Sequence, residues 1–117
     1  MATKEETAAF LAEFHQKMKI WEIRVRDDRA NNAQALLDLE ISPAQRMKII
    51  EALSTEDYSE GPNEDILNAG APLWVFGNTV KKTEIYIKIS VGTVNRPVIC
   101  ISFHPTEYTM RFPLKGV

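Results

Sequence analysis

The sequence predicts a single α+β domain, with helices of the N-terminal half packed on one face of an antiparallel β-sheet that the C-terminal half builds. Helix start signals occur in the first half, at Thr3 and at Ser42-Pro43. Strict alternation of apolar and polar residues, which is typical of half-buried strands, occurs in the second half over 84–91 and 98–104. A chain of 117 residues is long enough for one core and too short for two, so we expect one domain over residues 1–117.

The first half contains the predicted helices and one short strand. Thr3 is the expected N-cap of the first helix, and Asn31 or Asn32 the expected cap of the second. The third helix has the strongest start signal, because Ser42 precedes a proline and Gln45 completes a capping box. The predicted elements are, in order, a helix over 4–17, a strand over 20–25 that joins an edge of the sheet, a helix over 33–39 and a helix over 43–53.

The second half contains the predicted sheet. The segments are, in order, a loop over 58–72 with one helical turn at 64–67, a strand over 73–76, a turn over 77–82, strands over 84–91 and 98–104, and an extended or irregular tail over 105–117. An unstructured loop of that length is often functional. Trp74 and Phe76 alternate with smaller residues, so we expect them to face the core and to pack against Leu36, Met47 or Ile50. The opposite face of the sheet is expected to be partly open.

The two alternating strands predict a polar cluster on that open face. The expected core set on the first strand is Ile85, Ile87, Ile89 and Val91, and on the second strand it is Ile99, Ile101 and Phe103. The expected opposite sets are Glu84, Tyr86, Lys88 and Ser90 on the first strand, and Cys100, Ser102 and His104 on the second. If the strands pair antiparallel across the turn at 92–97, Tyr86 lies near His104 and Lys88 near Ser102.

Composition narrows the classes of function. The net charge of −2 and the pI of about 5.7 do not favour nucleic-acid binding, although basic residues cluster locally, as at Lys81, Lys82 and Lys88. A single cysteine, Cys100, argues against a disulfide framework and for a reducing compartment. No apolar run approaches the roughly 20 residues that span a membrane, and the first residues do not resemble a secretory signal. We therefore expect a cytoplasmic protein without membrane contact.

Sequence motifs for phosphate-binding loops, dinucleotide sites and zinc sites are absent, and the two histidines lie far apart in the sequence. No cofactor or metal is therefore expected. On the polar strand face, His104 is suited to acid–base work near neutral pH, Tyr86 to hydrogen-bond donation and Lys88 to stabilising a charged phosphorane. These are the groups that metal-free RNA cleavage requires. Solvated strand faces also carry such residues without any catalytic role, so both interpretations remain open at this point.

Four segments resemble the motility quorum-sensing regulator (MqsR) toxins in order and spacing. They are Leu53-Ser-Thr-Glu-Asp-Tyr58, Leu73-Trp74, Glu84-Ile-Tyr-Ile-Lys-Ile-Ser-Val91 and Val98-Ile-Cys-Ile-Ser-Phe103. The chain also resembles a variant group of that family through Arg26-Asp-Asp-Arg29 and Asp57-Tyr-Ser-Glu-Gly-Pro62. The resemblance spans nearly the whole chain. It implies a RelE-like fold and a cytoplasmic mRNA interferase that a cognate antitoxin neutralises.

The resemblance places some of the family's site residues on this chain and not others. The strand tyrosine falls on Tyr86 and the following lysine on Lys88. A family lysine falls on Glu60, a glutamine on Val75 and a second lysine on His104. RelE-type relatives often use a histidine at this end of the sheet, so the resemblance implies that His104 can preserve catalysis.

Two hypotheses follow from the sequence. The first is a toxin-like endoribonuclease with Tyr86, Lys88 and His104 as catalytic residues, and with RNA and an antitoxin as partners. Its expected phosphate-guiding residues are Lys81, Lys82, Ser102 and Arg111. The second is a non-catalytic module that kept the fold and binds a protein through the open face or the loop over 58–72, an alternative that the acidic residues of 56–65 favour. The sequence does not determine the RNA sequence that is cut or the oligomeric state.

Overall fold

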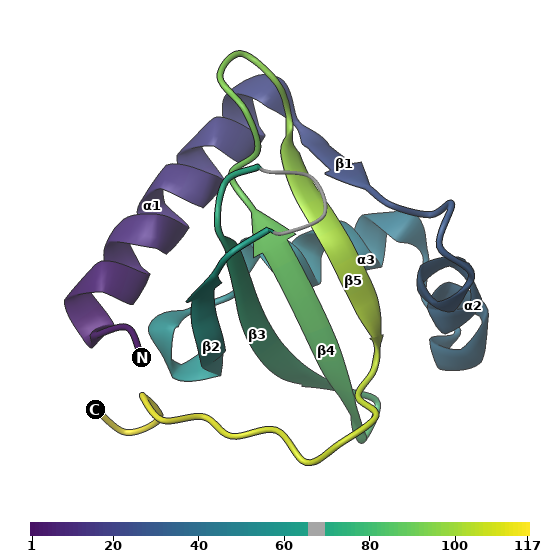
Figure 1. The fold of residues 1–117 in the computed structure, drawn as a ribbon. Helices are drawn as coiled ribbons and strands as arrows, with labels where there is room; N and C mark the ends of the chain where they lie inside the picture. Colours follow the sequence, from purple (N-terminus) through teal and green to yellow (C-terminus); the bar gives the residue numbers. More distant parts are fainter. Residues whose placement is uncertain (66–69) are drawn as a thin grey trace.

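The computed structural model describes residues 1–65 and 70–117 and has an α+β fold, as predicted (Figure 1). Its elements are, in chain order, α1 (Lys4–Trp21), β1 (Ile23–Val25), α2 (Ala30–Leu39), α3 (Pro43–Glu51), the 3₁₀ helix η1 (Thr55–Asp57), β2 (Tyr58–Asn63), β3 (Leu73–Val80), β4 (Thr83–Ser90) and β5 (Val98–Pro105). One five-stranded sheet has the order β1-β5-β4-β3-β2. In Figure 1 the helix α3 passes behind the sheet, α1 runs along its left side, α2 lies beside β5, and the C-terminal tail runs along the lower end of the sheet.

The caps predicted for the first and third helices are present. Thr3 caps α1 in a capping box with Glu6, and Ser42 caps α3 in a capping box with Gln45. The helix α1 continues to Trp21, beyond the predicted end, because its apolar stripe carries on into buried Met18. Residues 20 and 21 therefore belong to the helix and not to the predicted strand.

The sheet is mixed and not wholly antiparallel. The strand β1 pairs in parallel with β5 along Ile23↔Val98 and Val25↔Cys100, whereas the other neighbouring strands pair antiparallel. A parallel pair needs a long crossover connection, and here α2, α3 and three strands separate β1 from β5 in the chain. The predicted strand over 20–25 does join an edge of the sheet, but only as the short segment beginning at Ile23.

The helix α2 begins earlier than predicted because its cap is different. Arg29 occupies the N-cap without a side-chain capping bond, and the expected cap Asn32 is a buried residue inside the helix. The Asn32 amide donates to the carbonyls of Arg26 and Ile101 and accepts from the Phe103 N–H, at 2.8–2.9 Å. This asparagine therefore ties α2 to β5 and to the turn after β1. The helix α3 is tied to the same turn by the Arg46–Asp27 ion pair, at 2.8 Å.

The predicted loop over 58–72 is partly wrong, because its first six residues form β2, an edge strand that pairs with β3. Tyr58 is fully buried, and its hydroxyl accepts from the Ala2 N–H at 3.0 Å and donates to the Gly61 carbonyl at 2.5 Å. Two register shifts and the Gly61-Pro62 pair interrupt the alternation that would have revealed the strand. The helical turn predicted over 64–67 lies in part outside the described residues.

The strand β3 is longer than predicted and reaches Val80, so the predicted turn over 77–82 shrinks to two residues. Lys81 and Lys82 both have positive φ, of 50° and 68°, which matches the two-residue turns that suit the twist of a β-hairpin. The register of β4 on β5 is the predicted one, with Tyr86 opposite His104 and Lys88 opposite Ser102.

The predicted faces of β5 are half wrong, because the strand contains a bulge. Ser102 pairs with Lys88 and Cys100 pairs with Ile89, so Ile101 has no partner on β4. The bulge reverses the faces of the residues before it. Fully buried Cys100 therefore joins the core, while the expected core residues Ile99 and Ile101 are only half-buried and only Phe103 of the predicted set is fully buried. Ser102 and His104 lie after the bulge and pair with Lys88 and Tyr86 as predicted, but Ser102 is buried and not solvent-facing.

Aromatic rings from α1 and from β3 hold the core together. Trp74 and Phe76 face the core as predicted, but the Trp74 ring stacks on Phe10 of α1, with centroids 4.4 Å apart. The Tyr58 ring packs edge-on against Trp74 and Phe76, with ring centroids 6.0 and 6.1 Å apart. Of the predicted partners, Ile50 belongs to the same buried cluster, and Leu36 and Met47 lie at its border.

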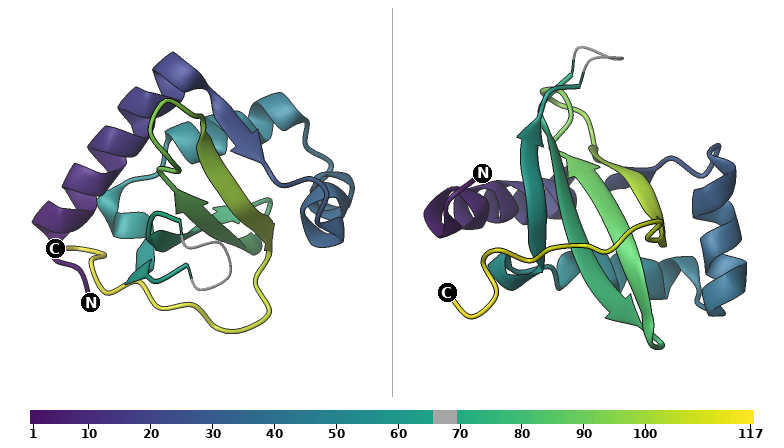
Figure 2. Two further views of the ribbon diagram at one scale, coloured as in Figure 1. Left: turned by 45° about the horizontal axis from the view of Figure 1, so that its top comes forward. Right: turned by 60° about the horizontal axis from the view of Figure 1, so that its bottom comes forward.

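The C-terminal tail covers part of the sheet face that was expected to be open (Figure 2). Met110 and Phe112 lie over Gly77 of β3 so closely that an added Cβ atom there would be 2.8–2.9 Å from them. The tail is anchored at its start by a bond from the Met110 N–H to Glu84 and at its end by buried Leu114. The tail was expected to be extended or irregular, and over the described residues 106–117 it forms no helix or strand and ends in a turn over 113–116. Its packing on the sheet was not foreseen.

Cys100 provides a test of the corrected face of β5. Its thiol is fully buried, and burial raises its pKa to about 12, so that the reactive thiolate is scarce at mildly alkaline pH. We expect no reaction of the folded protein with Ellman's reagent and stoichiometric reaction after unfolding in guanidinium chloride. Rapid reaction of the folded protein would place Cys100 on the solvent-facing side, as the simple alternation suggests.

Candidate functional site

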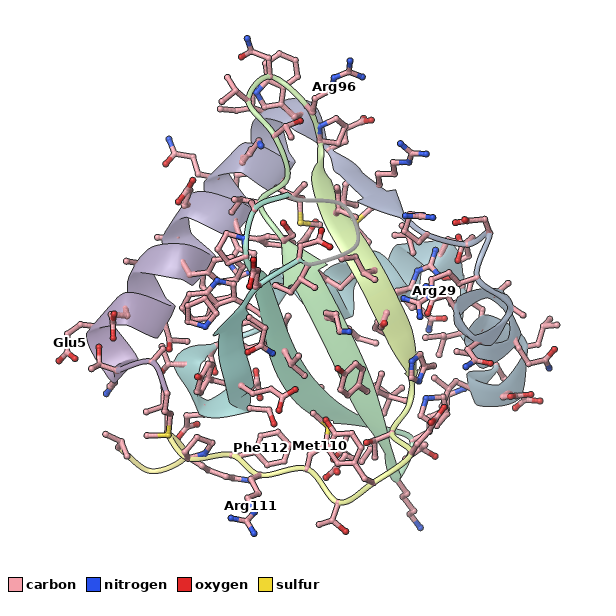
Figure 3. The ribbon with its side chains drawn as sticks, viewed as in Figure 1. Glu5, Arg29, Arg96, Met110, Arg111 and Phe112 are labelled. Atoms are coloured by element: carbon pink, nitrogen blue, oxygen red, sulfur yellow. The ribbon has the colours of Figure 1, made fainter. Side chains whose placement is uncertain are left out.

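The candidate site lies on the face of the sheet away from α1 and α3, where two rows of side chains cross the strands (Figure 3). One row runs from Gly77 through Tyr86 to His104, and the other runs from Val75 through Lys88 to Ser102. Because side chains at paired positions point the same way, both rows project from one face. The structure therefore brings together four of the residues predicted for the site, which are Tyr86, Lys88, Ser102 and His104.

His104 stacks on Tyr86, with ring centroids 5.6 Å apart and an angle of 18° between the planes. The sequence predicted that Tyr86 lies near His104, and the contact that the structure describes is between the two rings. The Nδ1 atom lies 2.9 Å from the Pro105 carbonyl. A carbonyl only accepts, so Nδ1 carries the proton and Nε2 presents a lone pair in the neutral ring. The hydrogen bond thus determines which nitrogen can take up a proton.

The surroundings of His104 leave room for a substrate group. His104 and Pro105 line a hollow of about 170 Å³, whose other walls are Glu107 of the tail and three polar residues of α2. The side chain is half-buried, because the Tyr86 ring covers one side of the imidazole. A ring held in this way keeps one orientation without being sealed from solvent.

Tyr86 is a hydrogen-bonding phenol and not a base. Burial, together with the neighbouring Tyr108 and Glu60, raises the pKa of its hydroxyl to about 12. The Tyr86 and Tyr108 rings meet edge-on, with centroids 6.0 Å apart. The hydroxyl of Tyr86 therefore stays protonated throughout the neutral range and can donate a hydrogen bond or a proton.

Cations lie on the β4, β5 and α2 side of Tyr86. The Lys88 ammonium is 5.7 Å from the centroid of the Tyr86 ring. Arg29, at the N-cap of α2, donates from Nη1 to the Ile101 carbonyl at 3.2 Å and to the Ser102 hydroxyl at 3.3 Å. Its other donors, Nε and Nη2, have no hydrogen-bond partner among residues 1–65 and 70–117. Ser102 itself is buried, so an anion on this face would meet the Lys88 ammonium and the partly unused guanidinium of Arg29.

Arg29, Tyr108 and Glu60 were not predicted as site residues. Arg29 carried a weak signal, since it closes the Arg-Asp-Asp-Arg stretch of the variant group. Tyr108 had none, because its position depends on the path of the tail across β4. Glu60 was noted only as a replaced family position, and the register Glu60↔Val75↔Lys88 now places it on the same row as Lys88.

Three of the predicted phosphate-guiding residues, Lys81, Lys82 and Arg111, lie away from this site. Lys81 and Lys82 are exposed at the β3–β4 turn, and the Lys81 ammonium donates to the Glu40 carbonyl at the C-cap of α2, at 3.0 Å. Arg111 is exposed on the tail, and Figure 3 shows its side chain directed away from the sheet. Only Ser102 among the predicted guiding residues lies beside the catalytic candidates.

Among residues 1–65 and 70–117, no group of three or more histidine, cysteine or acidic side chains is placed to hold a metal ion. Within the same ranges, no helix has the length and apolar character to cross a bilayer.

Comparisons with family models, with curated proteins and with solved structures find no match for this chain. The resemblance to MqsR toxins therefore stays a prediction.

Proposed function

We propose that this chain is an MqsR-like toxin that cleaves RNA by attack of a ribose 2′-hydroxyl on the adjacent phosphate. The observation that carries the proposal is the arrangement of one general base, one phenol and two cations on a single face. His104 offers Nε2 as a proton acceptor, Tyr86 offers a hydroxyl proton, and Lys88 and Arg29 offer positive charge.

The proposed reaction needs only these side chains. Nε2 of His104 removes the proton of the 2′-hydroxyl as its oxygen attacks phosphorus, and Lys88 and Arg29 stabilise the extra negative charge of the phosphorane. The bond from phosphorus to the 5′-oxygen then breaks, and the leaving oxygen takes a proton from the Tyr86 hydroxyl. A 2′,3′-cyclic phosphate and a free 5′-hydroxyl result, and proton exchange with solvent restores both side chains.

Arg29 is a candidate replacement for the cation that the family resemblance implies and that this chain lacks. In this chain Glu60 and Val75 stand where the resemblance implies a lysine and a glutamine. The guanidinium of Arg29 reaches the Ser102 hydroxyl on β5, whereas Glu60 lies on β2 at the opposite edge of the sheet. We propose that it supplies the cation that Glu60 does not, so that local charge suits phosphate despite a net charge of −2. A cytoplasmic location and an inhibitory antitoxin partner are parts of the same proposal.

The test is cleavage of a labelled RNA by the purified protein in the presence of a metal chelator. We expect products with 2′,3′-cyclic phosphate ends, and we expect a single 2′-deoxynucleotide at the cut position to block cleavage, because it lacks the attacking oxygen. The expected products would still form after repeated chelation. Cleavage that continues at the 2′-deoxy position would contradict the mechanism.

A second candidate function is a protein-binding module without catalysis. Glu60 lies on the same row as Lys88, and the pI of the chain is about 5.7. Both favour this alternative, because negative charge repels RNA phosphates. The same experiment separates the two functions. A folded preparation that leaves every tested RNA intact would favour the binding module.

A further inference from the structure

Charge is divided across the polar face of the sheet. Lys88 and His104 lie on the two central strands, and Arg29 approaches from the β5 side, whereas Glu60 lies on the edge strand β2. Glu60 and Lys88 occupy one row, separated by Val75. A carboxylate repels phosphate, so an RNA backbone on this face is held on the side of β5 and α2. Its bases are then directed toward β2.

An aromatic side chain lies between the two charged regions. Tyr108 is 51% exposed and meets Tyr86 edge-on. The tail holds it in place, because Met110 and Phe112 pack over Gly77 and the Met110 N–H donates to Glu84 at 3.3 Å. Exposed rings beside cations commonly stack with unpaired bases of single-stranded RNA. Tyr108 is therefore a stacking surface whose position is set by the fold.

Glu60 is a hydrogen-bond acceptor on the same face of the sheet. An ionised carboxylate only accepts hydrogen bonds, and the Glu60 carboxylate has no hydrogen-bond or ion-pair partner among residues 1–65 and 70–117. The register Glu60↔Val75↔Lys88 places this residue on the face that carries Tyr86, on which Tyr108 packs. Burial first, and the Glu60 charge second, raise the pKa of the Tyr108 hydroxyl. A base stacked on Tyr108 would therefore present its edge to an acceptor.

We propose that Tyr108 and Glu60 form a base-binding subsite that selects nucleobases carrying an exocyclic amino group. The amino group of adenine or cytosine donates to the Glu60 carboxylate, and a base without it leaves this acceptor unused. The subsite rests on the proposed function, since it lies beside the phosphate that would be cleaved. It adds a determinant that this chain has where the family resemblance implies a lysine.

The test measures binding of nucleoside 3′-monophosphates by NMR titration of the intact protein, without any need for cleavage. Adenosine 3′-monophosphate is compared with purine riboside 3′-monophosphate, which lacks only the amino group. Cytidine 3′-monophosphate is compared in the same way with its 4-deamino analogue. We expect the amino-bearing member of each pair to bind roughly 10- to 100-fold more tightly, as for a hydrogen bond to a charged group.

Variants separate the two roles within the subsite. Glu60→Gln, which removes the charge at constant size, is expected to bring the ratio within each pair close to one, whereas Tyr108→Ala is expected to weaken all four nucleotides and preserve the ratio. The matched control is Glu64→Gln, an exposed carboxylate beyond the end of β2, which should leave both values unchanged. Equal binding within the pairs by the wild-type protein, or no binding at all, would overturn the subsite even if RNA is cleaved. Discrimination by a protein that cleaves no RNA would support the subsite and overturn the proposed catalysis.

Discussion

Replacing His104 with alanine is expected to lower RNA cleavage by about 10²–10⁴-fold, the usual contribution of general acid–base catalysis. The physical reason is that Nε2 is the proton acceptor that the Pro105 carbonyl leaves open by binding Nδ1–H. The loss should appear mainly in kcat, since the imidazole acts on the 2′-hydroxyl proton and not on binding of the RNA chain. The measurement is the single-turnover rate on a labelled RNA, with thermal unfolding of each variant recorded alongside.

Two further substitutions sharpen this test. His15→Gln is the matched control, because His15 is the other histidine of the chain and lies on α1, away from the site. Its Nε2 lies 3.0 Å from the Ile50 carbonyl oxygen. This variant should cleave RNA at the wild-type rate. His104→Lys restores the residue that the family resemblance implies and should retain more activity than His104→Ala. A folded His104→Ala protein with the wild-type rate would show that His104 only ends the strand before Pro105.

Trp74→Ala is expected to lower the free energy of unfolding by about 3–5 kcal/mol, as for other buried large aromatic residues. Trp74 is 8% exposed, and its ring stacks on Phe10 of α1 at 4.4 Å and 10° and contacts Tyr58 of β2. Truncation would leave a cavity between the sheet and α1. A loss of this size is a large part of the stability of a small domain, so the thermal midpoint should fall on the order of 10–20 °C.

The chain contains its own control for this prediction. Trp21→Ala removes the other tryptophan, which is 42% exposed at the end of α1, and should change the free energy of unfolding by much less. Denaturant titrations of the two variants and the wild-type protein compare them directly. Similar losses for the two variants, or no loss for Trp74→Ala, would contradict the position of Trp74 between sheet and helix.

Helix starts and the register of the central hairpin were predictable because their signals are local. A capping box depends on residues three positions apart, and the box predicted at Ser42–Gln45 is present, as is the predicted N-cap Thr3. Alternation places a whole strand on two faces at once, and a one-residue slip would expose its apolar side. For this reason the pairing of Tyr86 with His104 could be stated from sequence alone.

Other features failed prediction because their cause lies far away in the chain. The bulge at Ile101 turns Cys100 toward the core, and the residues around it contain no sequence signal for a bulge. The strand β2 breaks its own alternation and is formed by pairing with β3 and by burial of Tyr58. Periodicity records which residues prefer to be buried, but not where a ladder of hydrogen bonds shifts by one residue.

The residues of the candidate site likewise fall into a group that was predicted from local sequence and a group that was not. Tyr86, Lys88, Ser102 and His104 were found from sequence, because one hairpin contains all four and its alternation orients them. Arg29, Tyr108 and Glu60 come from α2, the tail and an edge strand, so only the tertiary structure decided that they meet there. The sequence by itself determined the α+β class and the central polar pair. Packing between distant segments decided the charge around that pair, because electrostatic surroundings depend on distance in space and not on separation along the chain.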